Sequence, residues 1–210
     1  MLRARNLLEA STAIAAMAPV LGLGTRPESA NDLLRGAVVL GGSALDAFVH
    51  HVFSQRFVPY VTAHPATMAP GQSLHRYLRS IGVSNVSLKL PAPKKGKRPL
   101  GALRAAVDAR LFRTSLQNIS VVGQALDAVG LPNAVRDLAL ASGLLETTLR
   151  SRITKVTNRR NAIAHEGDLF RGKKKRFVSR PITEDNVRVW LDRVDDFVGR
   201  LDAYVIANPP

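Results

Sequence analysis

The stretch LLETTLRSRITKVTNRRNAIA, residues 144–164, carries the strongest helical pattern in the chain. Its large apolar residues recur at steps of four, four, three and seven positions: Leu145, Leu149, Ile153, Val156 and Ile163. Side chains at these steps lie on one face of an α-helix and form a narrow apolar stripe. The stripe predicts a central helix that buries one face against other helices, and we therefore expect an all-α fold.

The rest of the sequence has the same helical character, without a β-rich region or an internal repeat. Capping and breaking residues separate the segments: Pro19 and Gly130 end helices, and Thr183 starts one. Within the second helix, Gly41-Gly42 predicts either a close helix crossing or a kink. The further helices are predicted at 2–18, from Ser29 or Asn31 through Val52, and at 74–81, 100–116, 121–129, 134–142 and 183–206.

Residues 59–99 differ in texture from the rest of the chain, because five prolines precede Pro99 there. This pattern predicts a surface insertion with the short helix 74–81 and an extended piece at 83–90, rather than a second core. We therefore expect a single domain over residues 1–210, built as a helical bundle with one irregular insertion.

The composition narrows the classes of protein that need to be considered. The chain has no Cys, which excludes disulfides, thiolate nucleophiles and Cys-based zinc sites and fits a cytoplasmic location. The apolar stretch 13–23 is short and contains Pro19, so it predicts an ordinary helix rather than a cleaved signal. No stretch reaches the roughly 18 consecutive apolar residues of a membrane span, and we expect no membrane association.

The formal net charge of +14 indicates a polyanionic partner, for which a nucleic acid such as RNA is the leading candidate. The alternatives are a surface charged only for solubility and an acidic protein partner, such as an antitoxin or a regulatory protein. Two basic tracts are candidate RNA contacts. They comprise Lys94, Lys95, Lys97 and Arg98 in the first tract, and Arg171, Lys173, Lys174, Lys175 and Arg176 in the second.

The candidate site is the cluster of Arg160, Asn161 and His165 at the end of the central helix. Asn161 and His165 are four residues apart and share a face, whereas Arg160 and His165 leave the helix axis about 140° apart. Arg160 also falls in the apolar stripe, so it needs either a carboxylate such as Asp46 or an anion in a cleft. A twofold dimer brings two arginines and two histidines together and removes the geometric problem.

The chemistry of this cluster suits RNA cleavage. An imidazole can transfer a proton near neutral pH, and an arginine can hold a phosphate through paired donors. Together they suit cleavage by the RNA's own 2′-hydroxyl, with no cofactor and no metal required. The sequence has no HExxH motif, and Asp46 with His50 and His51 forms only a loose metal-type group.

The hexapeptide RNAIAH, residues 160–165, resembles the R-x4-6-H signature of the HEPN superfamily, and RRNAIAHEGD extends the likeness. SALDAFVHHVF early in the chain and ITEDNV at the start of the last helix are similar to that family's helix order, closest to its RiboL-PSP-HEPN group. The resemblance covers residues 30–60 and 100–206 loosely. Residues 59–99 have no counterpart in it.

The resemblance implies a helical homodimer with metal-independent endoribonuclease activity and two motifs meeting at the interface, as in toxin–antitoxin and anti-phage defence proteins. It implies catalytic roles for Arg160, Asn161 and His165, with supporting roles for Asp46 and Arg159. Two other interpretations remain: a non-catalytic module that binds RNA or protein, and a purely structural helix end.

Overall fold

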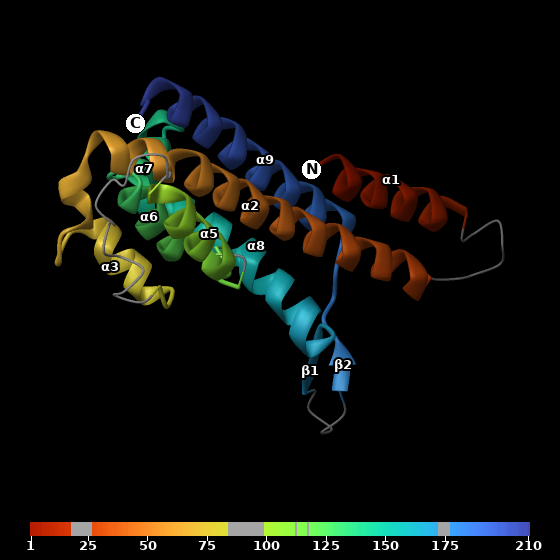
Figure 1. Cartoon of the computed structure of the whole chain (residues 1–210). Coiled ribbons are helices and arrows are strands. Elements are labelled where there is room, and N and C mark those ends of the chain that lie inside the picture. Colours follow the sequence, from red (N-terminus) through yellow and green to blue (C-terminus); the bar gives the residue numbers. More distant parts are fainter. Residues whose placement is uncertain (18–26, 84–98, 112, 117, 172–176) are drawn as a thin grey trace. The chain divides into compact units, whose positions relative to one another are not determined.

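The computed structural model describes residues 1–17, 27–83, 99–111, 113–116, 118–171 and 177–210, and these residues are almost entirely helical (Figure 1). The expected all-α class is confirmed, with one short antiparallel ribbon between the last two helices. The elements are α1 (Leu2–Met17), α2 (Glu28–Ala63), the 3-10 helix η1 (Pro65–Met68), α3 (Ser73–Ser80), α5 (Pro99–Leu111), α6 (Ile119–Ala128), α7 (Ala134–Ala141), α8 (Glu146–Glu166), β1 (Leu169–Arg171), β2 (Phe177–Ser179) and α9 (Glu184–Ala207).

Local capping explains where several of these helices begin. The Asn118 side chain accepts a hydrogen bond from the Ser120 backbone N–H at the start of α6. The Thr183 hydroxyl accepts one from the Asn186 backbone N–H ahead of α9, whose first turn carries Glu184 and Asp185. The predicted start of α9 is thus confirmed, because a hydroxyl cap and early carboxylates satisfy the positive helix end.

The apolar stripe of α8 is confirmed over most of its length. Leu149, Ile153 and Val156 are buried, and Ile163 packs against a core cluster. Leu145 is different, because it precedes α8 and is 74% exposed. The expected start of this helix was therefore two residues too early.

The chain divides into two compact units. Unit 1 comprises Met1–Leu45 and Thr147–Gly199, and unit 2 comprises Asp46–Glu146 and Arg200–Pro210. Helices α2, α8 and α9 contribute to both units. The prediction of one domain over the whole chain stays a prediction.

In unit 1, α8 and α9 both pack closely against α2 at the adjacent glycines 41 and 42. A Cβ atom on Gly41 would lie 2.6 Å from Leu191 Cδ2, and one on Gly42 would lie 2.9 Å from Arg160 Cγ. These two glycines therefore allow a close helix crossing, which was one of the two predicted alternatives. The core cluster beside them is formed by Leu8, Leu34, Ala37, Val38, Ile182, Val187 and Leu191.

In unit 2, the described part of residues 59–99 contributes to the core. Helix α2 continues through Pro59 to Ala63, and α3 then buries Leu74, Tyr77 and Leu78. The Tyr77 ring lies 5.3 Å from that of Phe53, centroid to centroid. The expectation of a purely surface insertion is therefore corrected for this part, because α3 has its own apolar face. Residues 84–90, expected to be extended, lie outside the described residues.

Helix α2 is long and apolar enough to cross a membrane by length and composition alone. Its apolar residues instead form core: Leu34, Val38, Leu45, Val49 and Phe53 are fully buried. The same helix carries the buried arginines Arg35 and Arg56. The core helix of a globular protein passes the same test, so the finding carries no conclusion about location.

Candidate functional site

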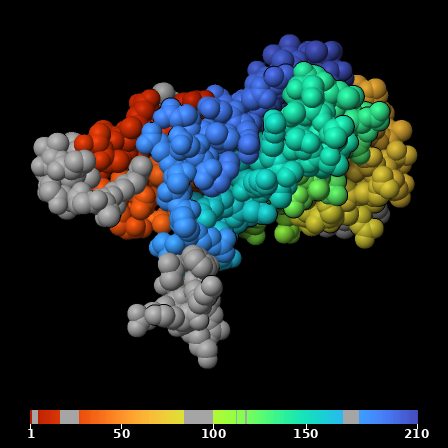
Figure 2. Space-filling model, turned by 180° about the vertical axis from the view of Figure 1, so that it is seen from behind, coloured from red at the N-terminus to blue at the C-terminus, as the bar shows by residue number. Residues whose placement is uncertain are grey.

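The motif residues occupy the last two turns of α8, within unit 1. Asn161 and His165 are exposed, and Arg160 is half-buried. The Arg160 Nη1 group donates a hydrogen bond to Asn161 Oδ1 at 3.1 Å. The amide that follows the arginine therefore holds one end of the guanidinium. Figure 2 shows the face on which segments of α8, in teal, and of α9, in blue, reach the surface.

The aliphatic part of Arg160 lies over Gly42 of α2. A side chain at residue 42 would collide with it, so the missing Cβ makes room for the arginine within the apolar stripe. The Arg160 Nε atom is buried and has no hydrogen-bond partner among the described residues. A buried donor without a partner is costly, and such atoms are often found where a ligand or water binds.

Asp46, one of the two predicted supporting residues, has local partners in unit 2. Its carboxylate accepts a hydrogen bond from the Leu116 backbone N–H and lies 3.9 Å from His50 Nδ1. His50 Nε2 in turn lies within hydrogen-bond distance of the Leu111 and Thr114 carbonyl oxygens. These contacts tie α2 to the turn after α5. They give Asp46 a structural role within unit 2, and its predicted supporting role stays a prediction.

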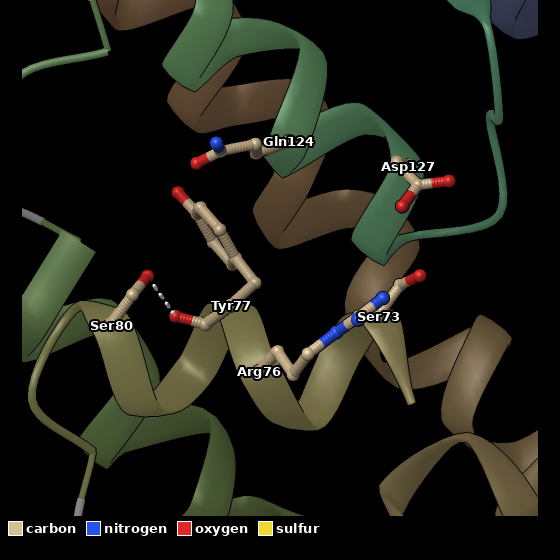
Figure 3. A pocket seen from close by; sticks show the side chains of 6 residues that line it. All are labelled: Ser73, Arg76, Tyr77, Ser80, Gln124 and Asp127. Atoms are coloured by element: carbon tan, nitrogen blue, oxygen red, sulfur yellow. Dashed lines mark hydrogen bonds between the residues drawn. The ribbon is translucent and has the colours of Figure 1, made fainter. Parts of the chain in front are cut away.

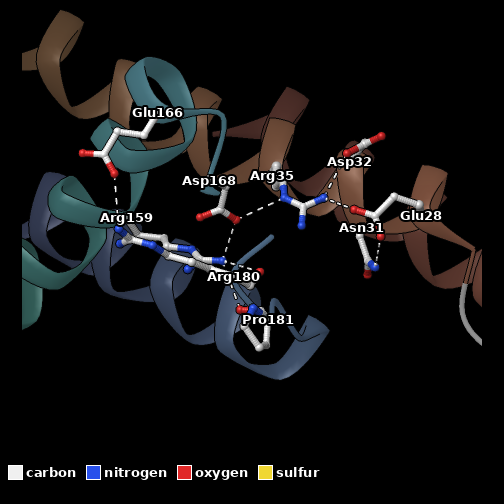
Figure 4. A network of polar contacts seen from close by, with 9 residues as sticks. All are labelled: Glu28, Asn31, Asp32, Arg35, Arg159, Glu166, Asp168, Arg180 and Pro181. Carbon is white, nitrogen blue, oxygen red and sulfur yellow. Dashed lines mark hydrogen bonds and ion pairs between the residues drawn. The ribbon is translucent and has the colours of Figure 1, made fainter. Parts of the chain in front are cut away.

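Arg159, the other predicted supporting residue, belongs to a buried ion-pair network (Figure 4). Its Nη2 group donates to Asp168 Oδ2 at 2.7 Å and to the carbonyl oxygens of Arg180 and Pro181. Burial lowers the pKa of the Arg159 guanidinium, and the Asp168 carboxylate opposes that effect. Arg159 thus joins the end of α8 to the segment that leads into α9.

Asp168 is the centre of this network and is fully buried. Its Oδ2 atom also accepts from Arg35 Nε at 3.1 Å, and Arg35 Nη1 reaches Glu28 and Asp32. Burial lowers the pKa of Arg35, but its hydrogen bonds to Glu28, Asp168 and Asp32 outweigh burial and raise that pKa overall. The Asp168 backbone closes the helix end, donating to the Ala162 carbonyl and accepting from the Arg180 N–H.

The sequence patterns gave Asp168 no predicted role, and they did not indicate Arg35 as a site residue. A local signal for Asp168 was present, because this carboxylate follows Gly167 at a helix end that carries the basic residues Arg159 and Arg160. The sequence did not indicate that Arg35 pairs with Asp168, because the two residues are 133 positions apart.

Buried polar atoms without a partner are concentrated at this end of α8. Four such side-chain atoms occur among the described residues, and three of them belong to Arg159, Arg160 and Asp168. The fourth is the hydroxyl of Tyr77 in unit 2. Native proteins keep few such atoms, so among the described residues the end of α8 is where buried polar groups are least satisfied.

The basic tracts fall almost wholly outside the described residues. This applies to Lys94, Lys95, Lys97, Arg98, Lys173, Lys174, Lys175 and Arg176, whereas Arg171 is the last residue of β1. In the ribbon, Arg171 pairs with Phe177 across the two strands. The described residues contain no group of three or more His, Asp or Glu side chains that could hold a metal ion.

Comparison with known proteins adds no relative. No protein-family model matches the chain, and neither the curated proteins nor the solved structures gave a match. The resemblance to the HEPN superfamily therefore rests on the motif and the order of the helices.

Proposed function

We propose that the protein is a metal-independent endoribonuclease whose active site forms between two copies of the chain. The observation that carries this proposal is the end of α8. There, Asn161 and His165 are exposed, and Arg160 bonds Asn161 while its buried Nε has no partner among the described residues. A phosphate oxygen is the ligand that a guanidinium with free donors prefers.

The proposed reaction uses the RNA's own 2′-hydroxyl as nucleophile. One His165 accepts the 2′-hydroxyl proton while the oxygen attacks phosphorus, and the bond from phosphorus to the 5′-oxygen breaks. The leaving 5′-oxygen takes up a proton from solvent water, and His165 returns its proton to solvent, so the products are a 2′,3′-cyclic phosphate and a 5′-hydroxyl. Arg160 stabilises the charge that builds on the phosphoryl oxygens.

Helix geometry supports the proposed dimer. Arg160 and His165 leave the α8 axis about 140° apart, so a single straight helix does not aim both at one phosphorus atom. The Asn161 contact holds Arg160 close to the chain, which leaves little freedom to swing toward its own His165. A twofold axis near the end of α8 would place the Arg160 of one copy beside the His165 of the other.

A role as a toxin or an anti-phage effector is part of the proposal and rests on the family resemblance. The net charge of +14 supports RNA as the substrate, because a basic surface concentrates polyanions. An antitoxin or a regulatory protein would then control the activity.

The test is cleavage of an end-labelled RNA by the purified protein in EDTA, scored for 2′,3′-cyclic phosphate ends. The wild type should cleave, and His165→Ala should lose about 10²–10⁴-fold in rate. His51→Ala is the matched control, because His51 is also an exposed helical histidine and should keep full activity. Strict dependence on added metal would rule out the mechanism.

The competing function is a non-catalytic module that binds RNA or a protein through the same surface. It predicts RNA binding that is equal in the wild type and in His165→Ala, with no cleavage by either protein. The same samples therefore separate the two functions.

A further inference from the structure

The last turn of α8 carries His165, which accepts the 2′-hydroxyl proton in the proposed reaction. His165 is exposed, and its ring has no hydrogen-bond or ion-pair partner among the described residues. The last four carbonyl groups of a helix lack intrahelical partners, and helix ends therefore fray more readily than helix centres. The position of His165 thus depends on the contacts that fix the end of α8.

The backbone fixes the turn that follows α8. Gly167 and Asp168 both have positive φ, 61° and 59°, a conformation that Asp tolerates better than most residues. The Asp168 N–H donates to the Ala162 carbonyl at 3.0 Å, and the Asp168 carbonyl accepts from the Arg180 N–H at 2.8 Å. Asp168 therefore joins the end of α8 to the segment that precedes α9.

The Asp168 side chain fixes the same turn to two helices of unit 1 (Figure 4). It is fully buried, and its Oδ2 atom accepts from Arg159 Nη2 of α8 at 2.7 Å and from Arg35 Nε of α2 at 3.1 Å. The Arg35 side chain is 11% exposed, and its Nη1 group also pairs with Glu28 and Asp32. Hydrogen bonds between charged groups are stronger than neutral ones, so this network restrains the turn firmly.

Arg160 is held by different contacts. Its aliphatic stem lies over Gly42, and its Nη1 group donates to Asn161 Oδ1 at 3.1 Å. None of these contacts involves Asp168 or its partners. Loss of the Arg35 contact should therefore free the last turn, with His165, while Arg160 keeps its place.

From these contacts we infer that Arg35 and Asp168 are positioning residues for the proposed proton transfer, because they fix His165 relative to Arg160 through the end of α8. The inference rests on the proposed ribonuclease function. It adds two residues that lie outside the α8 motif, and one of them belongs to another helix. A catalytic group that is misplaced by about 1 Å can cost on the order of 10²-fold in rate.

The kinetics of Arg35→Lys test the inference. Lysine lacks the Nε donor to Asp168 and keeps a positive charge beside Glu28 and Asp32. The kcat for RNA cleavage should fall about 10- to 100-fold, because His165 loses its fixed position. The KM should stay within about threefold of the wild type, because Arg160 still contacts the phosphate. Measurements are made below the temperature at which either protein begins to unfold.

Arg5→Lys is the matched control. Arg5 also pairs with two carboxylates of unit 1, Asp192 and Asp195, but its side chain is 39% exposed. The same substitution at this exposed ion pair should leave both kcat and KM unchanged. Asp168→Asn is the second test variant, because asparagine also tolerates the positive φ and removes only the charge. It should lower kcat at least as much as Arg35→Lys does.

Hydrogen exchange of the folded proteins locates the effect in the chain. In Arg35→Lys, the amides of residues 162–168 should exchange about tenfold faster than in the wild type, because the end of α8 opens more often. The amides of residues 149–156, in the middle of the same helix, should keep the wild-type rate. A general loss of stability would instead accelerate exchange in both segments equally.

The possible outcomes separate this inference from the proposed function. An active wild type with an equally active Arg35→Lys protein would overturn the inference and leave the ribonuclease function in place. Equal acceleration of exchange in both segments would also overturn it, because the network would then stabilise unit 1 without positioning His165. A wild type that does not cleave RNA would overturn the proposed function and this inference together.

Discussion

The end of α8 in unit 1 and helix α3 in unit 2 both hold buried polar atoms without partners among the described residues, but their chemistry differs. At the end of α8 the groups are charged, and Asp168 binds both Arg35 and Arg159. In α3 the buried group is the neutral Tyr77 hydroxyl (Figure 3). Removing the opposite charge from a buried ion pair is costly, whereas a lone buried hydroxyl costs far less. Changes in unit 1 should therefore divide into losses of stability and losses of activity, whereas removal of the Tyr77 hydroxyl should have little effect on folding.

The largest expected effect is complementation between two inactive variants. Arg160→Ala and His165→Ala should each be nearly inactive on RNA. Each mixed dimer, however, has one site in which both Arg160 and His165 are present. After mixing and re-association, activity should return to roughly a quarter of the wild-type rate, because half of the dimers are mixed and each has one complete site.

The measurement is cleavage of a labelled RNA before and after re-association of the subunits, with each variant mixed with itself as the control. Activity that does not return would show that the two copies do not share a site. Analytical ultracentrifugation of the same samples reports whether dimers are present.

The next largest effect concerns the stability of unit 1. Asp168→Asn leaves the guanidinium groups of Arg35 and Arg159 buried without their carboxylate, which should cost about 3–5 kcal/mol in the free energy of unfolding. Asp192→Asn is the control: Asp192 pairs with Arg5 on the exposed surface, and this change should cost less than about 1 kcal/mol. Urea unfolding measures both. If Asp168→Asn and Asp192→Asn lowered the free energy of unfolding by the same small amount, the buried network would contribute no more than the exposed ion pair.

A smaller effect is expected at the glycine beneath the motif arginine. Gly42→Ala places a Cβ atom 2.9 Å from Arg160 Cγ, so the arginine stem or α2 must shift. Overpacking of this kind costs about 1–3 kcal/mol, against which alanine's better helix propensity returns about 1 kcal/mol. The rate of RNA cleavage should fall clearly, because the shift moves the Arg160 guanidinium, whereas the free energy of unfolding should change only a little. Gly199→Ala on α9, with open space around it, is the matched control. Unchanged cleavage in Gly42→Ala would show that the position of Arg160 is not critical.

The smallest expected effect is that of Tyr77→Phe on folding. The change removes a buried hydroxyl without a partner among the described residues and keeps the ring that packs against Phe53. The free energy of unfolding should stay within about 1 kcal/mol of the wild type, or rise, because no hydrogen bond is lost. A clear loss of stability in urea unfolding would show that the hydroxyl makes a hydrogen bond in the folded protein and would contradict this expectation.

The extent of sequence prediction differs between the fold and the site. The helices were predictable because apolar spacing and capping residues act locally, as at Thr183. The motif could be proposed because Arg160, Asn161 and His165 lie within two turns. The core role of α3 and the passage of α2 through Pro59 were not predicted, because tertiary packing outweighed the local signal of proline.

The sequence by itself determined the all-α class, most helix positions and the grouping of three polar residues at the end of α8. Only the tertiary structure decided what each polar residue does. Arg159 and Arg160 are neighbours in sequence, but their side chains leave the helix about 100° apart. Arg159 therefore reaches the buried Asp168, whereas Arg160 lies over Gly42 and donates a hydrogen bond to Asn161. The partners of Asp168 and the packing of the Tyr77 ring against Phe53 likewise depend on segments far apart in the chain. Local spacing carries no information about such contacts, because they form only when the helices pack.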